Sequence, residues 1–221
     1  MQWQCVIFDC DGVLVNSETL YADILAEMSA ELGLALTRSA ALTLARGRAL
    51  ADCIREIEAR ISRPVPSDFE KTFRLRCSDI FQSQLRAIEG IDDVLNRIPV
   101  PYCIASNSPL GSTRSMLRIT GLSKHFGNRI YSSHQVRRWK PDPGVFLYAA
   151  ARMSVEPQAC AVIEDSEAGV KAAVAARMGV FVYTPPPGVN ELWTRGAGIT
   201  FSRMSDLPDL LFSVQPHAFN S

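Results

Sequence analysis

Two aspartates one residue apart have the type and spacing to do chemistry. Asp9 and Asp11 follow an apolar run, and Gly12 after them permits a sharp turn. Two carboxylates at positions i and i+2 can then point into one crevice, where their repulsion calls for a cation or a shared proton. A calcium loop is excluded, because an EF-hand needs an oxygen ligand and a glycine where Val13 and Leu14 stand. A plain surface turn remains the alternative.

Two more polar clusters follow apolar runs later in the chain. Ser106–Ser108 precedes a helix expected from Pro109, so its hydroxyls and backbone N–H groups could bind an anion or simply cap that helix. The pair Glu164 and Asp165 ends the most apolar run, where two acids are costly to bury without a cation. Together with Asp9 this pair would form an oxygen-rich site suited to a hard ion such as Mg²⁺.

One lysine is held in a restricted segment of backbone. Lys140 is followed by Pro141, and Pro143 fits the first turn of the next expected helix. A lone lysine before a helix is usually a solvated charge. It would take part in the chemistry only if it pointed at the carboxylates.

These clusters need a scaffold that brings them together, and the surrounding pattern predicts one. Short apolar runs that we expect to form strands alternate with helical patterns. These runs are 5–8, 102–105, 160–163 and 180–183, and two shorter runs at 130–131 and 199–201 are further strand candidates. Such alternation predicts an α/β fold, a Rossmann-like and mainly parallel sheet with helices on both faces. Ligands bind beyond the carboxyl ends of such strands, which is where the three clusters fall.

An all-helical block interrupts this alternation. Helical patterns at 17–33, 49–59 and 68–87 have no convincing strand between them. We therefore expect an inserted helical cap at residues 16–88 and a catalytic core made of residues 1–15 and 89–221.

Composition excludes several classes of partner. Of the 221 residues, 47% are hydrophobic and 21% charged, which is typical of a globular protein. The 23 basic and 23 acidic residues give zero formal net charge, so we expect neither nucleic acid nor an anionic membrane as a partner. No apolar run approaches the ~18 residues of a membrane span.

Cysteine usage and the N-terminus indicate the compartment. Six cysteines are present and none forms a CxxC pair, so we expect reduced, buried thiols rather than disulfides or a zinc site. Residues 1–5 have no basic segment typical of a secretory signal. We therefore expect a cytoplasmic protein. The working expectation for its oligomeric state is a monomer.

Taken in order, the motifs strand–DxDG, strand–SNS, Lys-Pro and strand–EDS resemble those of the haloacid dehalogenase-like hydrolase superfamily. The resemblance covers essentially the whole chain, and the helical block matches the cap that follows the first motif. Within the superfamily the chain is similar to the β-phosphoglucomutase-like phosphatase branch. The runs 8–12, 87–90 and 138–143 are similar to those of bacterial 6-phosphogluconate phosphatases.

The resemblance implies a role for each matching residue. Asp9 would be the nucleophile that takes up the phosphoryl group, and Asp11 would protonate the leaving alkoxide and then deprotonate the attacking water. Ser106 and the amide of Asn107 would hold the phosphoryl oxygens. Lys140 would neutralise charge on the nucleophile and the phosphate.

The resemblance also implies a Mg²⁺ site. The ligands would be the Asp9 carboxylate, the Asp11 backbone carbonyl and Asp165. Glu164 would be either a ligand or a residue behind the ligands.

Departures from the family pattern favour simple hydrolysis. The related mutases carry a histidine on the first cap helix and a basic residue shortly after the cap's glycine, and Tyr21 and Leu50 stand in those places. Asp11 argues against dehalogenation, because the dehalogenases lack the second aspartate. We expect a Mg²⁺-dependent phosphatase that hydrolyses small phosphorylated sugars or sugar acids, such as 6-phosphogluconate, through an aspartyl phosphate. The alternatives are a phosphosugar mutase on the same scaffold and a non-hydrolytic phosphosugar-binding protein.

Two arginines in the expected cap are candidates for substrate recognition. Arg46 and Arg48 flank a glycine that breaks the cap's helices, and either could pair with a substrate carboxylate. The alternative for each is an ordinary solvated arginine.

Overall fold

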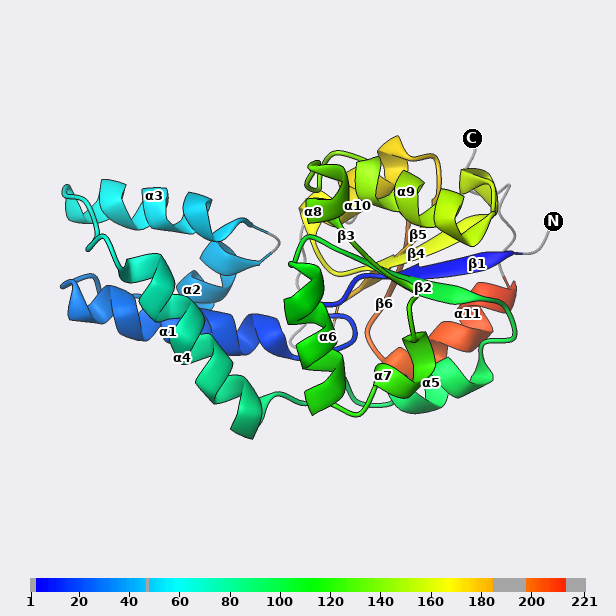
Figure 1. Cartoon of the computed structure of the whole chain (residues 1–221), viewed down its shortest axis with the longest axis horizontal. Helices are drawn as coiled ribbons and strands as arrows, with labels where there is room; N and C mark the ends of the chain where they lie inside the picture. Colours follow the sequence, from blue (N-terminus) through cyan, green and yellow to red (C-terminus); the bar gives the residue numbers. More distant parts are fainter. Residues whose placement is uncertain (1–2, 47, 185–197, 214–221) are drawn as a thin grey trace. The chain divides into compact units, whose positions relative to one another are not determined.

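The chain divides into two compact units. A computed structural model describes residues 3–46, 48–184 and 198–213 (Figure 1). Met1–Val15 and Ala87–Ser221 form one unit, here called the sheet unit, and Asn16–Arg86 form the other, here called the helical unit. The helical unit ends slightly before the boundary expected at residue 88. Ala87 forms a β-bridge with Val15, and the Ile88 N–H donates to the Leu14 carbonyl, so both residues belong to the sheet unit.

The sheet unit is built on one parallel sheet. Within the described residues its six strands have the order β3-β2-β1-β4-β5-β6 and all pair in parallel. The strands are β1 (Cys5–Phe8), β2 (Tyr102–Ser106), β3 (Ile130–Ser132), β4 (Cys160–Glu164), β5 (Gly179–Tyr183) and β6 (Ile199–Phe201). The predicted α/β fold with a Rossmann-like parallel sheet is confirmed.

Helices cover both faces of this sheet. In Figure 1, α9 and α10 lie over one face, and α5, α7 and α11 lie over the other. The helices of the sheet unit are α5 (Ile91–Arg97), α6 (Leu110–Ile119), α7 (Ser123–Phe126), α8 (Ser133–Val136), α9 (Gly144–Met153), α10 (Glu167–Ala175) and α11 (Leu207–Ser213), with 3₁₀ turns at Pro157–Ala159 and Met204–Asp206.

Side chains of β1 alternate between two apolar layers. Cys5 and Ile7 belong to a buried cluster that includes residues of α9 and α10. Phe8 faces the other layer, where its ring meets those of Tyr102 and Phe126 edge-on. Because β1 is buried on both faces, its sequence is an unbroken apolar run. The same packing fixes the position of Asp9, which follows the strand.

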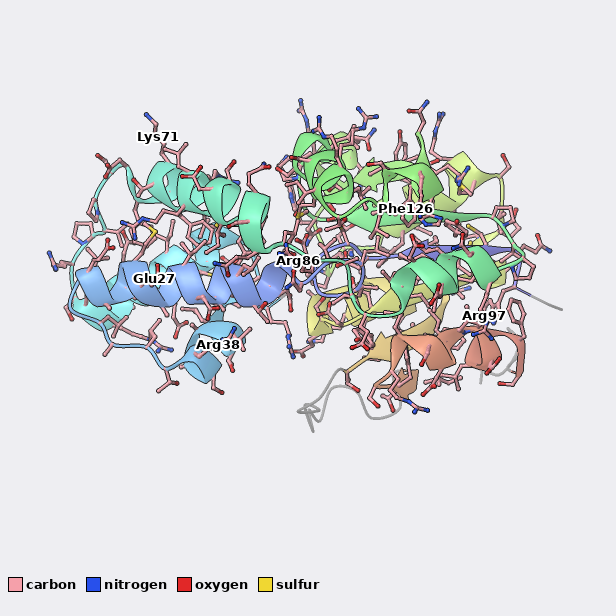
Figure 2. The ribbon with its side chains drawn as sticks, turned by 90° about the horizontal axis from the view of Figure 1, so that it is seen from below. Glu27, Arg38, Lys71, Arg86, Arg97 and Phe126 are labelled. Carbon is pink, nitrogen blue, oxygen red and sulfur yellow. The ribbon has the colours of Figure 1, made fainter. Side chains whose placement is uncertain are left out.

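The helical unit has its own core. Its helices in the described residues are α1 (Ser17–Glu31), α2 (Arg38–Ala45), α3 (Leu50–Ile61) and α4 (Phe69–Gln84). Tyr21 stacks on Phe73 and meets Phe81 edge-on, which ties α1 to α4. Figure 2 shows charged side chains such as Glu27 and Lys71 on the outside of this unit.

Two expectations about the environment can be compared with the structure. None of the helices in the described residues has the length and apolar character needed to cross a bilayer. All six cysteines fall within the described residues, and each is a buried free thiol. The expectation of buried, free thiols is therefore confirmed.

Candidate active site

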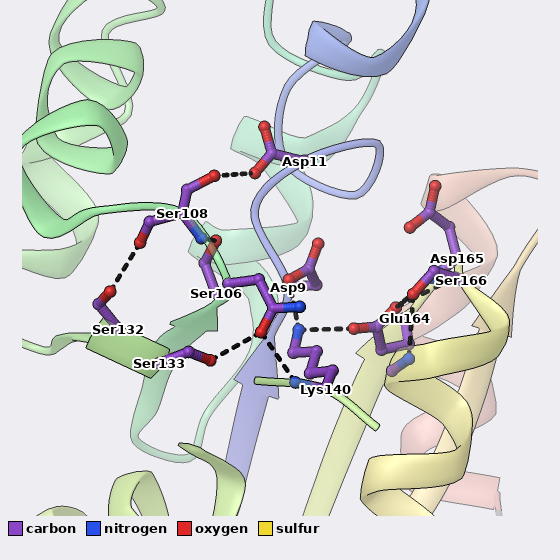
Figure 3. Close-up of polar contacts among 12 residues, drawn as sticks. Asp9, Asp11, Ser106, Ser108, Ser132, Ser133, Lys140, Glu164, Asp165 and Ser166 are labelled. Atoms are coloured by element: carbon purple, nitrogen blue, oxygen red, sulfur yellow. Dashed lines mark hydrogen bonds and ion pairs between the residues drawn. The ribbon is translucent and has the colours of Figure 1, made fainter. Parts of the chain in front are cut away.

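The ends of adjacent strands bring the acidic residues together. Asp9 directly follows β1, and its N–H donates to the Ile163 carbonyl of β4 at 2.9 Å. Asp9, Glu164 and Asp165 are all buried, and each offers a carboxylate oxygen within 4.8 Å of the others (Figure 3). Two sequence motifs far apart in the chain thus form one group of acids.

Lys140 points at these carboxylates rather than into solvent. Its Nζ lies 2.5 Å from Asp9 Oδ1 and 2.6 Å from Glu164 Oε1, and the residue is 7% exposed. Its backbone N–H donates to Asn107 Oδ1 at 3.0 Å, which fixes the lysine loop to the end of β2. The interpretation of Lys140 as a solvated charge is therefore wrong.

Burial and neighbouring charges shift the pKa values in this group. Burial raises the pKa of Asp9 well above its usual range, and the charges of Glu164 and Asp11 add to the effect, while Lys140 opposes it. Burial alone would lower the pKa of Lys140, but Asp9 and Glu164 outweigh it and raise that pKa, so the ammonium stays protonated. One ammonium thus lies among three buried carboxyl groups.

The donor set fits a hard divalent cation. Oxygen atoms of Asp9, Glu164 and Asp165 are the ligand type that Mg²⁺ prefers. The loop after β1 lies against this group, because a Cβ added at Gly12 would lie 2.1 Å from Asp165 Oδ2. The side chain of Asp11 is not part of the group of three.

Glu164 has a more specific position than the sequence indicates. Its Oε1 accepts from Lys140, while its Oε2 accepts from the N–H groups of Asp165 (3.0 Å) and Ser166 (3.1 Å) and from Ser166 Oγ (2.9 Å). Both oxygens are engaged by the protein itself. The sequence left Glu164 either as a metal ligand or as a residue that supports the ligands. This arrangement favours the supporting role, in which Glu164 orients Lys140.

A glycine in α10 makes room for Glu164 and gives the first testable prediction. A Cβ at Gly169 would lie 1.9 Å from Glu164 Oε1, so we expect Gly169→Ala to displace the carboxylate and lower the stability by roughly 1–3 kcal/mol through overpacking. Urea unfolding measures this. The control is Gly111→Ala in α6, where a Cβ meets nothing within 4 Å and should stabilise the helix by up to ~1 kcal/mol. Equal effects of the two changes would contradict the prediction.

The Ser106–Ser108 segment does not act as a helix cap. Helix α6 begins at Leu110 after Pro109, and no side chain caps its start. Instead Ser106 Oγ, which is buried, accepts the N–H of Ser108 at 3.0 Å. The Ser108 hydroxyl donates to Asp11 Oδ2 at 2.8 Å. The segment therefore joins the ends of β2 and β1 at the site.

Two serines at the end of β3 belong to the site and were missed in the sequence. Ser132 Oγ donates to the Ser108 carbonyl, and Ser133 Oγ donates to Asn107 Oδ1, both at 2.7 Å (Figure 3). The available signal was a fourth polar pair after an apolar run, but that run is very short. By these hydrogen bonds the two serines hold the Ser106–Ser108 segment in place.

The two candidate arginines have acidic partners within the helical unit. Arg46 Nε lies 3.2 Å from Glu18 Oε2, and Arg48 Nη2 lies 3.7 Å from Glu56 Oε2. Gly47 between them lies outside the described residues. Neither arginine is an isolated solvated charge. To pair with a substrate carboxylate, each would have to break its ion pair with Glu18 or Glu56.

Fold and site together define an α/β enzyme with a lysine–carboxylate centre at the carboxyl edge of a parallel sheet. A family model for haloacid dehalogenase-like hydrolases matches residues 3–177. The chain belongs to this family, which confirms the resemblance inferred from the motifs.

Several characterised or solved proteins are similar over nearly the full length. The 6-phosphogluconate phosphatase of Escherichia coli is 30% identical, over 94% of each chain. Hexitol phosphatase B of the same species is 28% identical, over 91% of this chain and 92% of that protein. A haloacid dehalogenase-like protein of Agrobacterium tumefaciens has a TM-score of 0.86 at 30% identity, covering 95% of this chain and 97% of the other. A family hydrolase of Deinococcus radiodurans, solved with phosphate and sodium, has a TM-score of 0.81 at 29% identity, covering 96% and 99%.

Proposed function

We propose that the chain is a Mg²⁺-dependent phosphatase that hydrolyses small phosphorylated sugars or sugar acids through an aspartyl phosphate on Asp9. The observation that carries this proposal is the buried contact of Lys140 with both Asp9 and Glu164, beside Asp165. Relatives named as phosphatases of 6-phosphogluconate, hexitol phosphates and fructose 1-phosphate support a phosphoric monoester as the substrate class.

Asp9 is the nucleophile in the first step. One of its carboxylate oxygens attacks phosphorus, the bond from phosphorus to the ester oxygen breaks, and the phosphoryl group is carried as an acyl phosphate. In the second step a water oxygen attacks the same phosphorus. The bond to Asp9 then breaks, which releases inorganic phosphate and restores the carboxylate.

Asp11 moves the proton in both steps. It gives a proton to the leaving alkoxide and takes one back from the attacking water, so its protonation state is restored at the end of the cycle. The Ser108 hydroxyl, 2.8 Å from Asp11 Oδ2, keeps this carboxylate near the phosphoryl site.

Charge is the main obstacle to this reaction. A phosphate dianion repels the Asp9 carboxylate, and Lys140 lowers that repulsion by its contact with Asp9. Ser106 and the Asn107 amide would hold the phosphoryl oxygens. Bound Mg²⁺ held by Asp9, Asp165 and the Asp11 carbonyl would supply further positive charge. Hydrolysis of phosphate monoesters needs up to ~10²¹-fold acceleration, far more than the ~10²–10⁴ of one acid–base group, so these elements act together.

Metal dependence is directly testable, and a stability readout separates it from activity. We expect chelation to abolish phosphate release and Mg²⁺ to restore it. Saturating Mg²⁺ should also raise the melting temperature, since a ligand at 100 Kd stabilises by about 2.7 kcal/mol. Asp165→Asn should lose this rise. The control Asp206→Asn, an exposed acid paired with Arg203, should keep it. A full rise in Asp165→Asn would contradict the assignment.

The mutase alternative lacks support in the helical unit. Tyr21, in the place of the mutase histidine, packs against Phe73 and Phe81. The non-hydrolytic alternative is disfavoured because Lys140 and the acids that hydrolysis needs are assembled. Conversion of one sugar phosphate into another without net phosphate release would revive the mutase. Tight binding without turnover of any ester would revive the binding protein.

Arg46 and Arg48 stay candidates for reading a substrate carboxylate. We expect Arg46→Ala or Arg48→Ala to raise KM several-fold for phosphorylated sugar acids and little for neutral sugar phosphates, because a bidentate pair is lost. Steady-state kinetics on both substrates measure this. Arg55→Ala is the control, since Arg55 pairs with Asp52 on its own helix. A similar rise for both substrates would show that neither arginine reads the carboxylate.

A further inference from the structure

The Ser108 hydroxyl connects the Asp11 carboxylate to the end of β2. Ser108 Oγ lies 2.8 Å from Asp11 Oδ2, a normal distance for such a bond. The Ser108 hydroxyl donates in this bond, and the Asp11 oxygen accepts. The residues are 97 positions apart in the chain, so the contact depends on the tertiary fold and not on a local turn.

The backbone of Ser108 is fixed on both sides. Its N–H donates to Ser106 Oγ at 3.0 Å, and its carbonyl accepts from Ser132 Oγ at 2.7 Å. Ser132 is buried and also accepts the His134 N–H at 3.2 Å. Pro109 restricts the backbone further. The hydroxyl of Ser108 therefore has only its own side-chain rotation left.

The orientation of an aspartate is a weak point in acid–base catalysis. The terminal torsion of Asp is broad, and a rotation exchanges the two oxygens. A proton on the wrong oxygen cannot reach the leaving group. We propose that Ser108 is a positioning residue that fixes the orientation of the Asp11 side chain. This rests on the proposed function, in which Asp11 is the acid–base group.

The bond restrains one oxygen of this carboxylate. By donating to Oδ2, the Ser108 hydroxyl ties Asp11 to a segment whose own backbone is held on both sides. A side chain restrained in this way presents the same oxygen to the leaving alkoxide, as the bond to phosphorus breaks, and to the attacking water in the next step. Without Ser108 one restraint on the rotation of this side chain is lost.

Leaving-group dependence tests this role. An alkyl phosphate needs its leaving oxygen protonated, whereas p-nitrophenyl phosphate needs this much less. We expect Ser108→Ala to lower kcat on a sugar phosphate roughly 10–100-fold, part of the ~10²–10⁴ supplied by a positioned acid–base group, and on p-nitrophenyl phosphate less than threefold. KM should change little. Ser108→Thr, which keeps a hydroxyl, should restore most of the loss.

A matched variant controls for purely structural effects. Thr113 is buried in α6, and its hydroxyl donates to the backbone carbonyl of Pro109 at 3.4 Å. Thr113→Val should keep wild-type kcat on both esters. Unfolding in urea shows whether Ser108→Ala and Thr113→Val lower stability to a similar extent.

A double variant completes the test. In an Asp11→Asn background Ser108→Ala should cause no further loss on the sugar phosphate, because its target is already gone. Equal loss on the two esters, or an undiminished loss in that background, would overturn the role of Ser108 and leave the proposed function intact. Activity of Asp9→Asn would instead overturn the proposed function itself, so the two failures are distinguishable.

Discussion

Asp9→Asn should lower phosphate release by a factor on the order of 10⁴ or more, because removing a nucleophile leaves only binding and charge stabilisation. The substitution keeps the shape of a side chain that is 8% exposed and adjoins Lys140. An amide is too weak a nucleophile to form the acyl phosphate. The measurement is phosphate release at saturating substrate and Mg²⁺, together with acid-quench mass spectrometry for a phosphorylated chain, which wild type should show and the variant should not.

Two controls make the Asp9 result interpretable. Asp206→Asn carries the same chemical change at an exposed ion pair with Arg203 and should retain full activity. Near-ultraviolet circular dichroism of Asp9→Asn should match wild type. Residual activity above about a tenth of wild type, in a preparation free of other phosphatases, would remove Asp9 from its assigned role.

Lys140→Met should impair both activity and stability. The ammonium is buried between Asp9 and Glu164, and taking one partner out of a buried ion pair costs about 3–5 kcal/mol. We also expect kcat to fall on the order of 10³-fold, comparable to the loss of one strong donor from a preorganised site. Urea unfolding and steady-state kinetics measure the two effects.

Magnesium distinguishes a charge effect from a packing effect at Lys140. If the instability comes from unbalanced carboxylates, Mg²⁺ should restore more stability to Lys140→Met than it adds to wild type. Lys171→Met, at an exposed pair with Glu167, is the matched control and should change stability by less than ~1 kcal/mol. An unaltered unfolding midpoint in Lys140→Met would refute the electrostatic account.

The sequence predicts the sheet better than the small helices. Strands such as β1 and β4 are buried on both faces, so they appear as unbroken apolar runs. Helix α2 was missed because, within this short helix, only Ala41 and Leu44 are buried, which leaves almost no periodic signal. Helix α8 consists of four residues and begins with a capping box between Ser132 and Gln135, a local signal that hydrophobic periodicity does not reveal.

The candidate site was predictable in its members but not in its contacts. Motif order identified Asp9, Lys140 and Asp165. The two aspartates follow apolar strands, and Lys140 lies in a proline-restricted segment before a helix. The role of Glu164 depends on which groups bind its two carboxylate oxygens. The sequence shows only that an acid stands at the end of a strand, and not which groups it contacts. The contacts of Ser132 and Ser133 arise because β3 pairs with β2 in a register that sets Ser132 beside Ser106, and the letters of the sequence do not give this register.

Strand order has a consequence for the making of this protein. A ribosome releases β1 first, yet the strand hydrogen-bonded to it on one side, β4, begins only at Cys160. The edge of β1 that pairs with β4 therefore stays without its partner strand through most of translation. Since exposed strand edges promote aggregation, the nascent chain is a candidate client for chaperones until β4 has emerged. The acidic group of Asp9, Glu164 and Asp165 is then completed late, once the end of β4 has emerged.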